Sequence, residues 1–183
     1  MSETVSKALV LTILRHAEDF PWRMQEVGLL GLRLDDQRQY RLHVWDPTYR
    51  TGEPPVHDHP YDFTSEVIVG EMTNTRYEVD PTGDRYIRYR YPPTAEDLRR
   101  RDTVTLTASP TTFREGGRYG QLAHELHDSS QLPGTVTVTR CSRVDVTDLT
   151  VCLRDGSSWR SGRARDATRD EVKSVVARAL EWF

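Results

Sequence analysis

Val56-His57-Asp58-His59-Pro60 and the run that follows it, Phe63 to Gly70, form the stretch of sequence from which the fold and the site are predicted. Side chains alternate along an extended strand, so His57 and His59 project to the same side. Two imidazoles on one side can reach a single metal ion. The approach to them, residues 52–55, disfavours a helix because a residue before proline is pushed to extended backbone geometry.

Short strands are expected over most of the chain, with a helix near each end. Residues 3–19 carry apolar side chains at roughly helical spacing, and residues 168–171 have the form of a capping box that starts a helix over 168–183. Strands are predicted at 27–34, 39–46, 71–79, 85–91, 103–107, 111–114, 135–140 and 149–154. Asp80 to Asp84 is expected to be a turn, and Arg99 to Arg101 a solvated loop or helix end.

This order of elements predicts a mainly β protein, an antiparallel double-sheet jelly roll or β-barrel over about residues 27–154. The 183 residues suit a single domain. On the strand at 39–46, Leu42 and Val44 share one face while Arg41, His43 and Trp45 share the other. One of these faces should look into the barrel.

Composition argues against several classes of protein. The formal net charge of −3 does not favour a nucleic-acid or membrane-surface binder. No run approaches the roughly 20 apolar residues of a membrane span, and Met1 to Arg15 lacks the regions of a signal peptide. The two cysteines, Cys141 and Cys152, make no disulfide framework. A cytoplasmic location is therefore expected.

The glycines and histidines resemble the first motif of the cupin superfamily, in which two histidines and a glutamate lie between two glycines. Gly52 leads the histidine pair and Gly70 closes the motif, but Phe63 takes the usual place of the glutamate. Glu66 lies three residues further on and, on an unbroken strand, faces away from the histidines. The second cupin motif is matched more loosely, by residues 116–120 and His127, with His124 as a rival. The resemblance covers about residues 40–140 and implies the cupin β-barrel.

In lacking the motif glutamate, the sequence resembles cysteine-dioxygenase-like cupins, which hold iron(II) with three histidines. This resemblance implies a metal set of His57, His59 and His127. It also implies a mononuclear non-haem iron dioxygenase acting with O2 on a small thiol or amino-acid-like substrate. Zinc, nickel, manganese and copper stay open as alternative metals, since zinc also accepts three histidines. A bulge at Pro60 would reverse strand parity and make Asp62 or Glu66 a ligand instead.

Further residues are candidates for roles around the metal. His43, on a strand expected beside the motif, and Tyr61, in phase with His59, are candidates for catalytic support. Arg41, Arg76 and Tyr77 are candidates to hold a substrate carboxylate, because arginine forms bidentate pairs with that group. Asp128 or a neighbouring serine is expected to accept a hydrogen bond from the second nitrogen of a ligand.

Two other functions remain open at this point. One is a cupin isomerase or lyase that uses another divalent metal. The other is a non-catalytic cupin that binds a small ligand, and a homodimer is compatible with any of these. The fold hosts all three, so the fold alone does not choose among them.

Overall fold

The computed structural model describes residues 5–37, 39–51, 54–91, 99–142, 148–157 and 164–183. Within these ranges the chain is mainly β, with two α-helices and one short 3-10 helix. The helices are α1 (Lys7–Arg15), η1 (Ala17–Asp19) and α2 (Arg169–Leu180). The strands are β1 (Arg23–Gln25), β2 (Val27–Arg33), β3 (Tyr40–Arg50), β4 (Val56–His57), β5 (Phe63–Val69), β6 (Glu71–Tyr91), β7 (Arg99–Arg114), β8 (Arg118–Gln121), β9 (Leu126–Gln131), β10 (Thr135–Cys141), β11 (Leu149–Arg154) and β12 (Arg165–Asp166).

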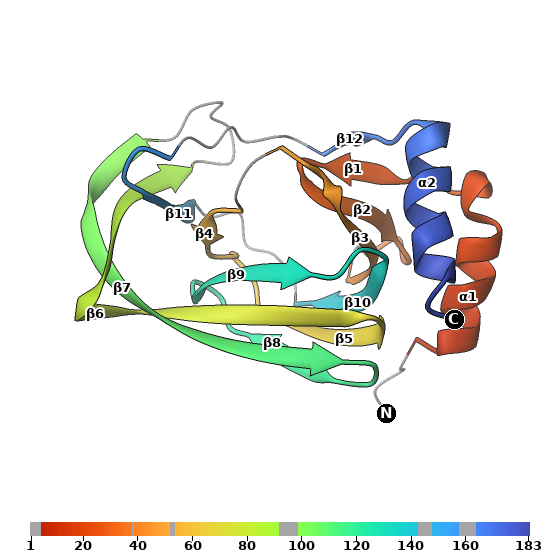
Figure 1. The fold of residues 1–183 in the computed structure, drawn as a ribbon, viewed down its shortest axis with the longest axis horizontal. Coiled ribbons are helices and arrows are strands. Elements are labelled where there is room, and N and C mark those ends of the chain that lie inside the picture. Colours follow the sequence, from red (N-terminus) through yellow and green to blue (C-terminus); the bar gives the residue numbers. More distant parts are fainter. Residues whose placement is uncertain (1–4, 38, 52–53, 92–98, 143–147, 158–163) are drawn as a thin grey trace.

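The strands form two antiparallel sheets (Figure 1). The larger sheet has the order β12-β1-β2-β3-β10-β5-β8, and the smaller sheet has the order β11-β4-β9-β6-β7 with an additional β11–β6 pairing. The prediction of a mainly β, antiparallel two-sheet fold with a helix near each end is confirmed.

Both α-helices pack against one face of the larger sheet, at the right of Figure 1. On β3, Leu42 and Val44 alternate with Arg41, His43 and Trp45, and only the first two join the core under the helices. The second set faces the other way and lines a cavity together with residues of the smaller sheet. The polar face of the strand is therefore the one that looks between the sheets.

The predicted capping box is present at the start of α2. The Thr168 hydroxyl accepts from the backbone N–H of Glu171, and the Glu171 carboxylate accepts from the backbone N–H of Thr168 at 2.8 Å. Helix α1 is shorter than the predicted 3–19, because it begins after an N-cap at Ser6 and gives way to η1 after His16. Residues 3 and 4 of that prediction lie outside the described ranges. Neither helix described by the structure has both the length and the apolar character needed to cross a membrane.

A turn was predicted at residues 80–84, but the chain does not reverse direction there. Strand β6 continues through it, and Val79 and Asp84 both lie opposite Leu106 of β7, so the extra residues form a bulge in a long ladder. Asp80 does make the local hydrogen bonds of a turn to the backbone N–H and hydroxyl of Thr82. Local turn chemistry was read correctly, but pairing with β7 keeps the chain running in one direction.

Arg99 to Arg101 are exposed to solvent as predicted, but they form neither a loop nor a helix end. These residues begin β7, where Arg99 and Arg100 pair with β6 and all three side chains are exposed. The two short strands predicted at 103–107 and 111–114 belong to the same strand. Strand β6 supplies hydrogen-bond partners along the length of β7, including its exposed polar segments. The local sequence pattern carries no information about that partner strand.

The histidine segment leaves its strand early. β4 holds only Val56 and His57, and the chain re-enters a sheet at Phe63 in β5. Gly70 then turns β5 into β6 with a φ of 86°, and a Cβ there would lie 2.5 Å from the Thr135 hydroxyl oxygen. Only glycine suits this position, so the glycine that closes the sequence motif has a steric reason.

Candidate metal centre

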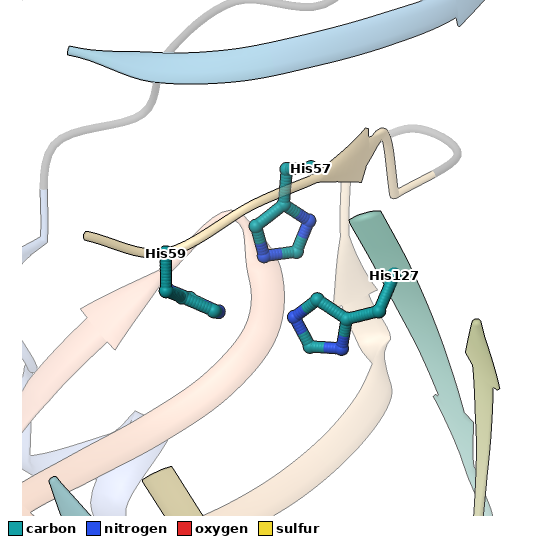
Figure 2. A group of neighbouring side chains, drawn as sticks. All are labelled: His57, His59 and His127. Atoms are coloured by element: carbon teal, nitrogen blue, oxygen red, sulfur yellow. The ribbon is translucent and has the colours of Figure 1, made fainter. Parts of the chain in front are cut away.

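Three histidine side chains converge between the sheets, as Figure 2 shows. His57 on β4 lies directly opposite His127 on β9 in the antiparallel ladder, so the two rings share one face. His59 follows two residues later. The ring centroids are 4.8 to 5.1 Å apart, and one ring nitrogen from each residue lies within 4.8 Å of the others.

Hydrogen bonds fix the tautomers of two of these rings. His57 Nδ1 donates to the Pro55 carbonyl at 3.0 Å, and His127 Nδ1 donates to Asn74 Oδ1 at 2.9 Å. Each Nε2 therefore carries a lone pair. His127 Nε2 is buried and has no hydrogen-bond partner among the described residues. Leaving a buried acceptor unpaired costs about 1–3 kcal/mol, so the position suits a bound cation.

The backbone around the histidines is held from two sides. The buried Asp58 side chain points away from the rings and accepts from the Thr150 backbone N–H at 2.7 Å. Asp58 also contacts His124 Nδ1 at 3.3 Å, and the His124 backbone N–H donates to the His59 carbonyl at 2.9 Å. In the sequence His57-Asp58-His59, the two imidazoles therefore point inward, and the Asp58 carboxylate between them binds the backbone of β11.

Burial keeps the imidazoles neutral. It lowers the pKa of His127 to about 3, assisted by the nearby His57 and Arg76, and it lowers the pKa of His57 despite the hydrogen bond to Pro55. Burial also lowers the pKa of His59 well below its usual value, and the neighbouring imidazoles act in the same direction. Neutral imidazole is the form that ligates a metal, so binding requires no proton to leave at pH 7.

The three rings line a cavity of about 400 Å³ between the sheets. Arg41, His43 and Tyr61 line it as well. The strand of His43 was expected beside the histidine motif, but β3 pairs with β2 and β10 instead. Tyr61 stacks on His59 with ring centroids 5.2 Å apart, and its hydroxyl accepts from Arg41 Nη1 at 3.0 Å. Burial raises the pKa of Tyr61. Apolar walls come from Val27, Leu29, Phe63, Leu149 and Val151.

The carboxylate alternatives lie outside this cavity. Glu66 faces away from the rings and pairs with Arg118 across β5 and β8 at 2.8 Å. Asp62 is exposed and accepts from the Ala123 backbone N–H at 2.7 Å. Phe63, in the place of the usual motif glutamate, sets its ring centroid 5.3 Å from that of His59.

Other sequence candidates are also elsewhere. His124 has a side chain 54% exposed and a backbone φ of 64°, and it stands outside the three-histidine group. The Arg76 guanidinium bonds to the Gly120 carbonyl and lines a separate hollow. Tyr77 donates to Asp128 at 2.8 Å on the far side of β9. The structure therefore does not bring Arg76 or Tyr77 to the cavity with Arg41.

The orienting partner of His127 is Asn74, which sequence reasoning missed. The expected partner was Asp128 or a neighbouring serine, but Asp128 accepts a hydrogen bond from Tyr77 instead. One signal was present: asparagine is disfavoured in strand interiors, yet Asn74 stands in the middle of a predicted strand. A buried polar residue at such a position usually has a specific partner.

The donor set fits a metal ion. Three neutral nitrogens lie within 4.8 Å of one another. Ligands of one ion at metal–nitrogen distances of about 2.1 Å are roughly 3.0–3.4 Å apart, so the more widely spaced rings must move closer together when an ion binds. No protein-family model matches the chain, and comparison with curated proteins found no match either. The fold and the site thus define a mainly β, two-sheet protein with a three-histidine group able to hold a metal ion.

Proposed function

We propose that the chain is a cupin-type, mononuclear metal enzyme that oxygenates a small anionic substrate of thiol or amino-acid kind. The observation that carries the proposal is the convergence of three neutral imidazoles, two with Nδ1 engaged and one with a buried, unpartnered Nε2. Iron(II) is the proposed ion, since three imidazoles on one face would leave open positions where substrate and dioxygen meet.

Arg41 is the proposed anchor for the substrate's anionic group. Its guanidinium reaches the cavity beside Tyr61, and its Nε is buried without a hydrogen-bond partner among the described residues. A half-buried cation with an unused donor favours a carboxylate, which accepts two parallel hydrogen bonds from such a fork.

Tyr61 would orient the substrate at the side of the metal site. Its hydroxyl accepts from Arg41 and keeps its own proton to donate, while its ring lies against His59. An anion bound by Arg41 therefore meets a second donor close to the imidazoles. His43, half-buried near the Thr139 hydroxyl, would shape the polar wall of the cavity.

The apolar residues around the rings would exclude water from the reacting groups. Phe63 lies against both His59 and His127 and takes the motif position where a carboxylate ligand would otherwise stand. A site with three neutral ligands keeps the full charge of a divalent cation, which favours an anionic substrate in the open positions.

Oxygen consumption by the iron-loaded protein with a panel of thiols and amino acids tests this function. The proposal predicts uptake that depends on the substrate and is lost in His57→Ala. Arg41→Gln should raise KM for an anionic substrate while leaving metal content unchanged. Metal binding without oxygen uptake would favour an isomerase or lyase, and absence of metal binding would favour a small-ligand-binding module.

A further inference from the structure

A buried polar pair bridges the two sheets behind the histidine group. Asn74 on β6 belongs to the smaller sheet, and Gln121 at the end of β8 belongs to the larger one. The two residues are 3% and 1% exposed. Asn74 Nδ2 donates to Gln121 Oε1 at 3.4 Å, and Asn74 Oδ1 accepts from His127 Nδ1 at 2.9 Å. These hydrogen bonds connect Gln121 on the larger sheet, through Asn74, to the His127 imidazole on the smaller sheet.

Packing alone does not account for this pair. Burying an amide costs free energy unless all its groups are hydrogen-bonded, and Gln121 Nε2 is buried without a partner among the described residues. Apolar side chains of similar size would fill the same space without that cost. The surroundings would accept them, since Gln121 stands opposite the buried Phe63 and Asn74 is two residues from the buried Met72.

We infer that Asn74 and Gln121 are positioning residues that select the metal-binding tautomer of His127. An asparagine side chain can present either its oxygen or its NH2 group to a neighbour. With the oxygen toward His127, Nδ1 keeps its proton and Nε2 is free to ligate. With the NH2 toward His127, Nδ1 must accept, the proton moves to Nε2, and that nitrogen cannot bind a metal.

Gln121 favours the first of these two orientations of Asn74 as long as its own Oε1 faces Nδ2. Its Oε1 faces Asn74 Nδ2, so the arrangement with the Asn74 oxygen toward His127 makes two hydrogen bonds. After a flip of Asn74 alone, two oxygens would face each other at the Gln121 end. The glutamine thus acts on the ligand from the other sheet, without touching it.

His57 differs in this respect. Its Nδ1 donates to the carbonyl of Pro55, a backbone group that has no donor to offer, so its tautomer needs no side chain to select it. His127 is the ligand whose tautomer depends on replaceable side chains. Substitutions at positions 74 and 121 should therefore weaken metal binding through His127.

This inference rests on the proposed metal site, and the experiment separates the two. The affinities of wild-type protein and variants for Zn²⁺ are measured by competition with a chromogenic chelator, and the Co²⁺-loaded forms are compared by visible absorption. Asn74→Leu should bind Zn²⁺ about 10–100-fold more weakly, the usual effect of removing a partner of a metal-ligating histidine. Asn74→Asp should restore the affinity, because a carboxylate can only accept.

Substitutions of Gln121, which contacts Asn74 but not His127, give a second, independent test. Gln121→Leu should weaken Zn²⁺ binding by about tenfold, the lower end of that range, and Gln121→Glu should preserve it because an acceptor remains. The Co²⁺ spectrum should change in both leucine variants and stay close to wild type in Asn74→Asp. Thr75→Val, on the opposite face of β6, is the matched control with wild-type affinity. Thermal unfolding identifies any variant that does not fold.

The outcomes are distinguishable. If wild-type protein binds no ion, the proposed metal site fails, and this inference fails with it. If wild-type protein binds through its histidines but the folded leucine variants at 74 and 121 bind as tightly and give the same Co²⁺ spectrum, the positioning role is overturned alone. Loss of affinity in Asn74→Asp equal to that in Asn74→Leu would also overturn it, because the tautomer would then be irrelevant.

Discussion

Replacing His127 and His124 one at a time separates the proposed third ligand from its nearest rival. His127→Ala removes a 5%-exposed imidazole whose Nε2 faces the other two rings without a partner. A ligand should matter at least as much as an orienting partner, whose loss costs 10–100-fold. Metal affinity should therefore fall at least that far, or about 1.4–2.8 kcal/mol. The stability of the metal-free protein should change less, because Asn74 Oδ1 loses its donor but a buried, unpartnered Nε2 is removed at the same time.

His124→Ala should be mild. The His124 side chain is 54% exposed, and the buried Asp58 that it contacts keeps its hydrogen bond from the Thr150 backbone N–H, so the lost contact should cost only about 0–1 kcal/mol. The backbone N–H that holds the His59 carbonyl remains in the variant. Metal affinity should stay within about fivefold of wild type, which is 1 kcal/mol. Chelator competition gives both affinities and thermal unfolding gives both stabilities. A larger loss of affinity in His124→Ala than in His127→Ala would refute the assignment of the third ligand.

Three further substitutions test other parts of the account. Glu66→Gln should leave metal affinity nearly unchanged, since this carboxylate pairs outside the cavity; a tenfold loss in a metal titration would restore the carboxylate-ligand alternative. Asp58→Ala should lower the free energy of unfolding by about 1–3 kcal/mol in a denaturant titration, because a buried backbone N–H loses its acceptor; an unchanged midpoint would contradict the anchoring role. The hydrogen-bonded Arg165 lowers the pKa of Glu171 to about 2 from 4.5, so its contribution to stability is present above about pH 4.5 and is lost as pH falls toward 2. Glu171→Gln should therefore flatten thermal stability over that interval, whereas an unaltered acid profile would show that the ion pair contributes nothing.

Much of the fold followed from local pattern. The capping box at Thr168, the strand at 135–140 and the two faces of β3 were all predicted, because each depends on residues near one another in sequence. The bulge in β6 and the arginines at the start of β7 were mispredicted for the opposite reason. In both places the conformation depends on the pairing of β6 with β7, and the register of that pairing cannot be predicted from the local sequence.

The site divides in the same way. His57 and His59 were found from their spacing, and His127 from its resemblance to a cupin motif. The convergence of the three rings depends on the pairing of β4 with β9, which brings residues 70 positions apart into direct opposition. Asn74 was missed and Arg76 was misplaced, because their contacts, Asn74 with His127 and Arg76 with the Gly120 carbonyl, join segments that are far apart in sequence. Which polar strand residue reaches a ligand is set by contacts between sheets.

The central claim is that His57, His59 and His127 hold one metal ion between the sheets. The most direct test is a crystal of the metal-loaded protein measured at the absorption edge of that metal. The account predicts one anomalous peak per chain, about 2.1 Å from the Nε2 atoms of all three histidines. An anomalous peak bound elsewhere, or by Asp62 or Glu66, would contradict it, and so would a fully loaded sample with no peak among the three rings.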